Sequence, residues 1–234
     1  MSAVSGQRRV ALADLGAADA LSLIDLVAGA ELVCFPTDTV YGIGGLLRPS
    51  VGRRVYEVKG RAADKPLQVI FPTVESLIVA VAMGRQTLDA VRRLLPGGLT
   101  LLLPYPEGLD YPPPGGLEAR GNARRGRAVE TLGVRVPRWP EAARVLGALS
   151  LPFLGSSANV SGAPPARTPD DVDARIRAAC DLLLDAGPVA GVASTVVDLT
   201  VFEEGRRWRV LRTGAVSETE IREMLRRKRE DLPR

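Results

Sequence analysis

The sequence predicts a single α/β domain, and three observations lead to that expectation. Short apolar runs of the kind that form buried strands alternate with segments whose apolar residues recur at helical spacing. The chain has 234 residues, of which 46% are hydrophobic and 25% charged, which is ample for one continuous core. Neither an internal repeat nor a convincing linker divides it. We therefore expect one domain over residues 1–234, with its core at about 14–216.

Strands are expected where apolar runs are bounded by turn-forming residues. In chain order they are residues 32–35, 67–71, 99–103, 132–136, 152–155, 194–199 and 207–211. Helices are expected where apolar residues recur every three or four positions, as they do at Val51, Val55 and Val58. The other helices are residues 17–28, 74–83, 85–95, 141–149, 170–180 and a basic C-terminal helix at 217–229. Capping residues Thr168 and Ser217 mark the start of the last two.

Two segments are expected to be irregular. Residues 37–45 are so rich in hydroxyls and glycines that we expect a turn, in which the backbone can approach a ligand closely. Residues 105–128 form a long Pro/Arg-rich stretch with little apolar periodicity, which predicts a mobile loop. Such a loop is either disordered or functional, and its arginines would suit a lid over a phosphate ligand.

The composition restricts the chemistry. The chain contains no histidine, which removes the commonest general base and the commonest transition-metal ligand. His-dependent hydrolases and most transition-metal enzymes are therefore disfavoured. A net charge of +4 favours an anionic partner, without deciding between a nucleotide, RNA and a merely basic surface. Cys34 and Cys180 are far apart and lack CxxC spacing, so neither a disulfide framework nor a zinc site is indicated.

The sequence also predicts a cytoplasmic protein. No apolar run is long enough to span a membrane, and the first nine residues are not followed by the apolar segment of a signal peptide. We expect no membrane partner.

The most informative chemistry lies in two segments about a hundred residues apart. Lys59, Arg61 and Lys65 follow a helix, and three cations held close together repel one another unless an anion lies among them. A phosphate-bearing ligand is the natural counter-charge. Residues 156–162, SSANVSG, add hydroxyls and an amide that can bind such a ligand. The alternative is a solvated basic turn and a serine-rich loop bonded only to its own backbone.

Seven motifs, in this order along most of the chain, resemble the YrdC-like L-threonylcarbamoyladenylate synthase family in its short, single-domain form. They are FPTDTVYGIG (35–44), KGR with KPL (59–61 and 65–67), PGGLT (96–100), GVRVP (133–137), SANVSG (157–162), STVVD (194–198) and LRTG (211–214). The resemblance implies one twisted mixed-sheet α/β domain with flanking helices and a large basic concave groove. It also implies a reaction that joins L-threonine, bicarbonate and ATP into threonylcarbamoyl-AMP and releases pyrophosphate, for N6-threonylcarbamoyladenosine in tRNA.

The same resemblance implies roles for individual residues. The Lys-x-Arg and Ser-x-Asn signatures fall on Lys59, Arg61, Ser157 and Asn159, as catalytic residues. Threonine or its carbamate would be bound by Thr39, Arg135, Gly155 and Ser194, and ATP by Arg61, Lys65, Thr131, Ser157 and Arg212. We expect Mg²⁺ to assist with the phosphates, although the sequence shows no carboxylate cage for it. The product would pass to a tRNA threonylcarbamoyl transferase complex.

The chain departs from the family pattern at three positions. Ile70 stands where many relatives have histidine, Pro165 where serine is frequent, and Thr213 where proline or serine is common. Ile70 and Pro165 leave one alternative open, a paralogue that uses a different carbamoyl or acyl adenylate. The other alternative is a double-stranded RNA or tRNA binder of the same fold that uses the concave basic face, which would bind RNA with a steep salt dependence and turn over no nucleotide.

Overall fold

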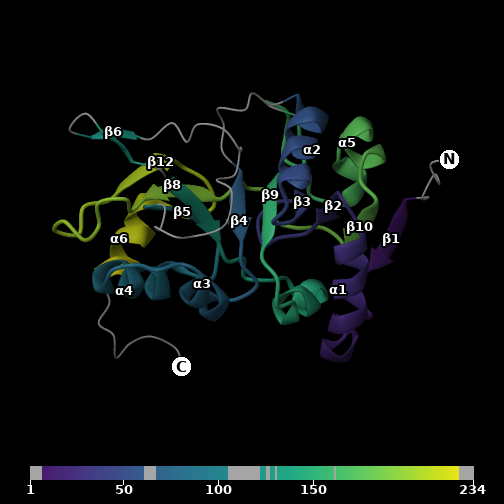
Figure 1. Cartoon of the computed structure of the whole chain (residues 1–234), viewed down its shortest axis with the longest axis horizontal. Helices are drawn as coiled ribbons and strands as arrows, with labels where there is room; N and C mark the ends of the chain where they lie inside the picture. The colour runs from purple at the N-terminus through teal and green to yellow at the C-terminus, as the bar shows by residue number, and fades with distance from the viewer. Residues whose placement is uncertain are drawn as a thin grey trace.

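A ten-stranded mixed β-sheet forms the centre of the molecule (Figure 1). The computed structural model describes residues 7–60, 67–104, 122–124, 127–129, 131–160 and 162–226. The strands of this sheet are β1 (Arg8–Ala11), β2 (Val33–Phe35), β3 (Gly42–Leu46), β4 (Gln68–Ile70), β5 (Leu99–Pro104), β8 (Thr131–Arg135), β9 (Phe153–Ser157), β10 (Leu182–Asp185), β11 (Thr195–Asp198) and β12 (Arg209–Arg212). Their spatial order is β1-β10-β2-β3-β9-β4-β8-β5-β11-β12.

Helices and 3-10 turns connect these strands. The α-helices are α1 (Ala20–Gly29), α2 (Pro49–Lys59), α3 (Val74–Ala80), α4 (Arg85–Leu94), α5 (Ala174–Ala178) and α6 (Glu218–Arg226). The 3-10 segments are η1 (Ala17–Asp19), η2 (Glu141–Ala148) and η3 (Pro169–Asp171). The α/β class, the mixed sheet and the flanking helices expected from the sequence are confirmed. None of the helices in the described part of the chain has the length and apolarity needed to span a bilayer.

The sheet half made of β1, β10, β2, β3 and β9 is covered on both faces. Along β10, Leu182 and Leu184 pack into one apolar cluster with α1 and η2, whereas Leu183 packs into another with α2 and α5. Along β9, Phe153 and Leu154 divide between the same two clusters. Successive residues of a strand point to opposite faces, so strands buried on both faces are apolar at consecutive positions.

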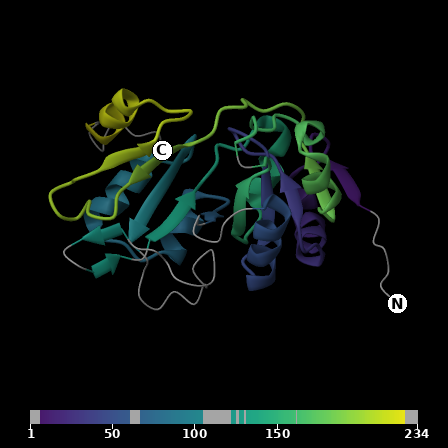
Figure 2. The same ribbon diagram turned by 90° about the horizontal axis from the view of Figure 1, so that it is seen from above.

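In the other half, from β4 to β12, the helices that the structure describes pack on one face. Leu99, Leu101 and Leu103 of β5 belong to an apolar cluster that also holds residues of α3, α4 and α6. Thr100 and Leu102 alternate with them and line a cavity on the opposite face. Figure 2 shows the two halves side by side, with β1 at one end of the long axis and β12 and α6 at the other. The one-sided half therefore supplies a sheet face on which a ligand can lie.

Two expectations about local structure were wrong, and two strands were not expected at all. The turn expected over residues 37–45 is only partly a turn, because Gly42–Leu46 is strand β3, paired with β2 and β9. A Cβ at Gly44 would lie 1.8 Å from the backbone oxygen of Leu154, so the glycines that suggest a turn serve close strand pairing instead. The helix expected over 170–180 is divided into η3 and α5, because Val172 is extended and the Asp173 carboxylate caps a new helix. Strands β1 and β10 were missed.

The remaining elements differ from expectation in helix type or in their ends, or fall partly outside the described residues. Residues 141–149 are 3-10 rather than α-helical. Within the expected loop at 105–128, β6 (Asn122–Arg124) and β7 (Arg127–Val129) form a two-stranded hairpin, and most of the remaining loop lies outside the described residues. Helix α6 begins as expected, with Ser217 and Glu220 bonded to each other in a capping box, and the expected end at residue 229 lies outside the described part.

Candidate functional site

A cavity of about 600 Å³ lies over the uncovered face of the sheet. We call it the sheet cavity. It is lined by Thr37, Val40, Gly42, Leu67, Gln68, Ile70, Thr100, Leu102, Gly133, Arg135, Gly155, Ser156, Ser157, Ala193, Ser194, Val196, Leu211 and Arg212. These residues belong to all seven sequence motifs or lie next to them. Some of them come from the chain segment after β10 that crosses between the two halves of the sheet (Figure 2). Four of the predicted ligand residues, Arg135, Gly155, Ser157 and Ser194, are therefore brought together with a fifth, Arg212.

Lys59 reaches this region from the end of α2. Gly60 ends the helix in the left-handed conformation, with φ of 55°, which glycine adopts without strain. The Lys59 side chain then runs inward, where its Nζ donates to the Ser156 hydroxyl at 3.1 Å and to the backbone oxygen of Ser157. Lys59 is only 5% exposed, so its charge acts in a region with little screening by water. The other predicted cations, Arg61 and Lys65, lie outside the described residues.

Arg135 provides a second buried cation, at the end of β8. Its Nη2 donates to the Asp38 carboxylate and to the Thr39 hydroxyl, and the other Asp38 oxygen accepts from the backbone N–H of Arg138 at 3.1 Å. Burial lowers the pKa of Arg135, the Asp38 charge opposes that effect, and the nearby Arg212 adds to it. Its Nε is buried without a hydrogen-bond partner in the described structure. A buried donor of this kind is costly unless a ligand accepts from it.

The turn after β2 holds these partners in place. The Thr37 hydroxyl donates to the backbone oxygen of Val40 at 2.6 Å and lies 3.1 Å from the Thr39 hydroxyl. Both threonines are 1% exposed. Thr39 does not line the sheet cavity itself, and it reaches the site through its bond to Arg135. Thr39 therefore lies beside the cavity, bonded to the guanidinium group of Arg135.

A chain of side-chain hydrogen bonds crosses the floor of the sheet cavity. Arg212 Nη2 lies 2.9 Å from the Ser194 backbone oxygen and 3.3 Å from its hydroxyl. The Ser194 and Thr100 hydroxyls are 2.7 Å apart, and Thr100 donates to Gln68 Oε1 at 3.0 Å. The sequence reasoning included Arg212 and Ser194 among the site residues but missed Thr100 and Gln68. The signal was available, since both lie at or directly beside a motif and on the polar positions of otherwise apolar strands.

Glycines keep two positions of the cavity wall open. A Cβ at Gly42 would lie 2.9 Å from the Phe35 ring, and a Cβ at Gly155 would lie 3.0 Å from Ile70 Cδ1. Ile70 lines the cavity as an apolar residue with 1% exposure. This wall thus offers an apolar surface beside the cations.

Two predicted residues lie elsewhere. Asn159 donates its amide to the backbone oxygen of Ala163 at 2.6 Å and is not among the residues that line the sheet cavity. Thr131 begins β8, paired with Pro104, and does not line it either. The spacing of a motif fixes the sequence positions but not the direction of each side chain.

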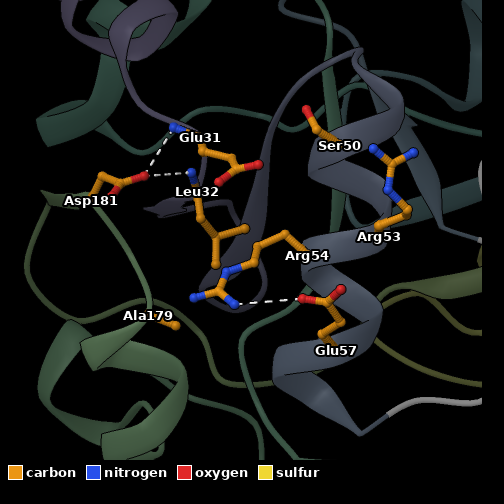
Figure 3. A pocket seen from close by; sticks show the side chains of 8 residues that line it. All are labelled: Glu31, Leu32, Ser50, Arg53, Arg54, Glu57, Ala179 and Asp181. Atoms are coloured by element: carbon orange, nitrogen blue, oxygen red, sulfur yellow. Dashed lines mark hydrogen bonds and ion pairs between the residues drawn. The ribbon is translucent and has the colours of Figure 1, made fainter. Parts of the chain in front are cut away.

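A second cavity, of about 310 Å³, lies between α2 and the segment before β10. Figure 3 shows its lining, in which Arg54 faces Glu57 and Asp181 faces the backbone of Glu31 and Leu32. The Arg54–Glu57 ion pair is 3.5 Å long. The Asp181 carboxylate accepts hydrogen bonds from the backbone N–H groups of Glu31 and Leu32 at 2.9 and 3.0 Å. These charges already have partners within the chain, so the sheet cavity is the better candidate.

The described residues do not fit a protein-held metal ion. They contain no group of three or more His, Cys, Asp or Glu side chains placed to hold one. Asp38, near the sheet cavity, already accepts from Arg135 and Arg138. The chemistry of the site is therefore that of cations, hydroxyls, amides and backbone N–H groups, which suits an anionic ligand.

Comparison with known proteins agrees with this geometry. A family model for Sua5, YciO and YrdC proteins, described as telomere recombination, matches residues 25–214. The threonylcarbamoyl-AMP synthase of Pyrococcus abyssi is 34% identical over 173 residues, which are 73% of this chain and 47% of that protein. The threonylcarbamoyl-AMP synthase of Xanthomonas campestris pv. campestris (strain B100) is 30% identical over 194 residues, 80% of this chain and 92% of that protein.

A solved structure is also similar. The crystal structure of P. abyssi Sua5 complexed with L-threonine has a TM-score of 0.70 and 29% identity, and the match covers 93% of this chain and 59% of that one. This chain therefore spans about half the length of the P. abyssi synthase, and most of the length of the X. campestris one. The family match over most of the sequence, together with relatives at 30% identity or more, shows that the chain belongs to the Sua5/YciO/YrdC family.

Proposed function

We propose that this protein is an L-threonylcarbamoyladenylate synthase, which joins L-threonine, bicarbonate and ATP into threonylcarbamoyl-AMP and releases pyrophosphate. The observation that carries the proposal is the pair of buried cations, Lys59 and Arg135, beside one cavity lined by hydroxyls and backbone. The names of the P. abyssi and X. campestris relatives support the same reaction. The product would serve N6-threonylcarbamoyladenosine formation in tRNA, in the cytoplasm.

The absence of histidine is compatible with this reaction. Threonine and bicarbonate give a carbamate that is already an anion, so its attack on the α-phosphorus of ATP needs no general base. The obstacle is repulsion between the carbamate and the triphosphate. Buried positive charge offsets that repulsion and stabilises charge that moves in the transition state, which is the chemistry that Lys59 and Arg135 can supply.

The two substrates would occupy neighbouring parts of the site. Arg135, Thr39, Ser194 and the open backbone at Gly155 would bind threonine or its carbamate, in line with the L-threonine bound by the P. abyssi protein. Lys59, Ser157 and Arg212 would bind the ATP phosphates, with Arg61 and Lys65 as further predicted contacts. Asn159 and Thr131 remain predictions from the resemblance. Any Mg²⁺ would arrive on the ATP phosphates, because the described residues offer no cage for it.

The proposal also includes a larger groove and two macromolecular partners. The large basic groove implied by the resemblance would extend the sheet cavity. The adenylate would be handed to a tRNA threonylcarbamoyl transferase complex, and contact with tRNA or double-stranded RNA would be secondary to catalysis. RNA binding without nucleotide turnover is the result that would replace the proposed function.

The test is pyrophosphate release from ATP and bicarbonate, with and without L-threonine, and identification of the adenylate by mass. We expect release that depends on threonine. Lys59→Ala and Arg61→Ala should abolish it while the protein stays folded. Arg53→Ala is the matched control, because Arg53 lies on the same helix as Lys59 but lines the second cavity. Unchanged turnover in the first two variants would reject the site assignment.

A further inference from the structure

Gln68 occupies a central place in the sheet cavity that the proposed reaction leaves without a role. It is the first residue of β4, directly paired with Gly155 of β9, and it lines the cavity. Its side chain reaches over β8, the next strand, to Thr100 of β5. A Cβ at Gly133 of β8 would lie 3.7 Å from the Gln68 Cβ and 3.5 Å from Leu102 Cδ2, which are ordinary van der Waals distances, so the glutamine passes closely over this residue. The glutamine side chain lies at the cavity surface.

The donors and acceptors at its two ends fix the direction of the hydrogen-bond chain. A guanidinium group only donates, so the Ser194 hydroxyl accepts from Arg212. A carbonyl oxygen only accepts, so the Thr100 hydroxyl donates to Gln68 Oε1. The remaining link, 2.7 Å long, is then Ser194 donating to Thr100. The hydroxyl protons of Ser194 and Thr100 are therefore both donated within this series of hydrogen bonds.

This direction determines what the side chains of Ser194 and Gln68 can offer a ligand. Ser194 can offer only a lone pair from its side chain, whereas Gln68 Nε2 carries two N–H groups that take no part in the chain. We propose that Gln68 Nε2 donates to an anionic oxygen of the amino-acid substrate, its carboxylate or the carbamate formed from it. Gln68 is thus a further substrate-binding residue. The assignment rests on the proposed function.

The neighbours of Gln68 place it at the amino-acid end of the site. Gly155, its direct partner, and Ser194, two hydrogen bonds away, are both proposed to bind threonine. Arg135 follows Val134, which pairs with Leu101, so the guanidinium-bearing residue stands beside Thr100 on the same face. An oxygen bound there would have a charged donor on one side and a neutral donor on the other, the arrangement that stabilises a carboxylate.

The test replaces the amide with groups of nearly the same shape. Gln68→Glu keeps the oxygen that accepts from Thr100 but removes the N–H donors and adds negative charge. We expect its KM for L-threonine to rise about tenfold or more, because a hydrogen bond is exchanged for repulsion, while its KM for ATP stays within about twofold. Gln68→Met, neutral and unable to donate, should raise the threonine KM about three- to tenfold. Calorimetric titration with L-threonine should give the same order.

Gln86→Glu is the matched control. Gln86, on α4, is likewise partly buried, and it is not among the residues that line the cavity. Its amide donates to the Glu203 backbone oxygen and accepts from Arg206. The same chemical change there should leave both KM values as in the wild type. Urea unfolding of every variant identifies any general loss of folded protein.

Three outcomes would overturn the assignment and can be told apart. Unchanged threonine KM in both Gln68 variants would show that the amide does not contact the substrate. A lower threonine KM in Gln68→Glu would mean that the oxygen, rather than the nitrogen, faces the ligand and binds its ammonium group. Wild-type protein without threonine-dependent release or binding would overturn the proposed function and this assignment with it, and the wild-type trace alone identifies that case.

Discussion

The ammonium group of Lys59 lies 3.1 Å from the hydroxyl oxygen of Ser156, so the last residue of α2 is joined to β9 across 97 positions of sequence. Helix α2 ends where the serine-rich strand ends, and the cation is buried against that strand. The two segments that the sequence marks as an anion site therefore form one site through this contact.

Lys59→Met should separate catalysis from stability. Methionine keeps most of the apolar stem of lysine but is one atom shorter, and it leaves the Ser156 hydroxyl and the Ser157 backbone oxygen without this donor. We expect kcat/KM to fall about 10²- to 10³-fold, as when an electrostatic donor is removed from an active site. The free energy of unfolding in urea should fall by about 1 to 3 kcal/mol, because buried acceptors lose their donor. If kcat/KM fell only as far as the loss of folded protein explains, Lys59 would act mainly in folding.

Gly44→Ala should destabilise the sheet strongly. The new Cβ would lie 1.8 Å from the Leu154 backbone oxygen, which cannot rotate away, so β3 and β9 would have to separate. We expect a loss of about 3 kcal/mol in urea unfolding. Gly29→Ala is the control, since a Cβ there meets nothing within 4 Å, and it should stabilise α1 by about 0.5 kcal/mol. Equal effects of the two substitutions would contradict the strand pairing.

Asp198 should make stability depend on acid pH. Burial by itself raises its pKa, but hydrogen bonds from the Thr200 hydroxyl and N–H and from Arg209 outweigh it and hold the pKa below the usual value. A lowered folded-state pKa stabilises the protein above the unfolded value of about 4, and that contribution is lost as the pH falls through the folded value.

The measurement compares wild type with Asp198→Asn in urea at pH 7 and at decreasing pH below about 4. At pH 7 the variant should be less stable by about 1 to 3 kcal/mol, since charged hydrogen bonds are lost. The difference should shrink as the pH falls. A difference that is constant with pH would show that the charge of Asp198 contributes nothing.

Both thiols should be unreactive in the folded protein. Cys34 and Cys180 are free and buried, and burial raises the pKa of both, that of Cys180 to about 12. At pH 8 roughly one Cys180 in 10⁴ would be a thiolate. We expect a thiol reagent to modify neither cysteine in buffer and both in urea. Rapid modification in buffer would contradict the burial of these two thiols.

The sequence predicts most of this fold where side chains decide the outcome. The apolar run predicts the strand at Leu99–Pro104, and the capping residues Thr168 and Ser217 predict two helix starts, where the structure shows the local hydrogen bonds of these caps. Glycine-rich β3 could not be recognised in this way, because its pairing depends on the absence of side chains that a distant strand requires. The apolar run of β10 gives no indication of its two parallel partners.

The site was predictable to a similar depth. Motif spacing identifies Lys59, Arg135 and Ser157, since each stands at the end of an element that points to one region. It does not give the direction of Asn159, whose amide turns to Ala163, nor does it single out Gln68. The proposed role of Gln68 follows from its hydrogen bond to Thr100, which lies two strands away in the sheet.

The place of β10 between β1 and β2 has a consequence for how the chain assembles. Arg8 pairs with Leu182, and Leu182 also pairs with Val33, so two early segments meet only through a late one. During synthesis, which begins at the N-terminus, β1 has no partner in the sheet and β2 has one free edge until residues 182–185 leave the ribosome. Pairings so distant in sequence form slowly, and open edges attract other chains. We therefore expect the nascent chain to be a client of chaperones that shield unpaired strands, well before it can bind any substrate.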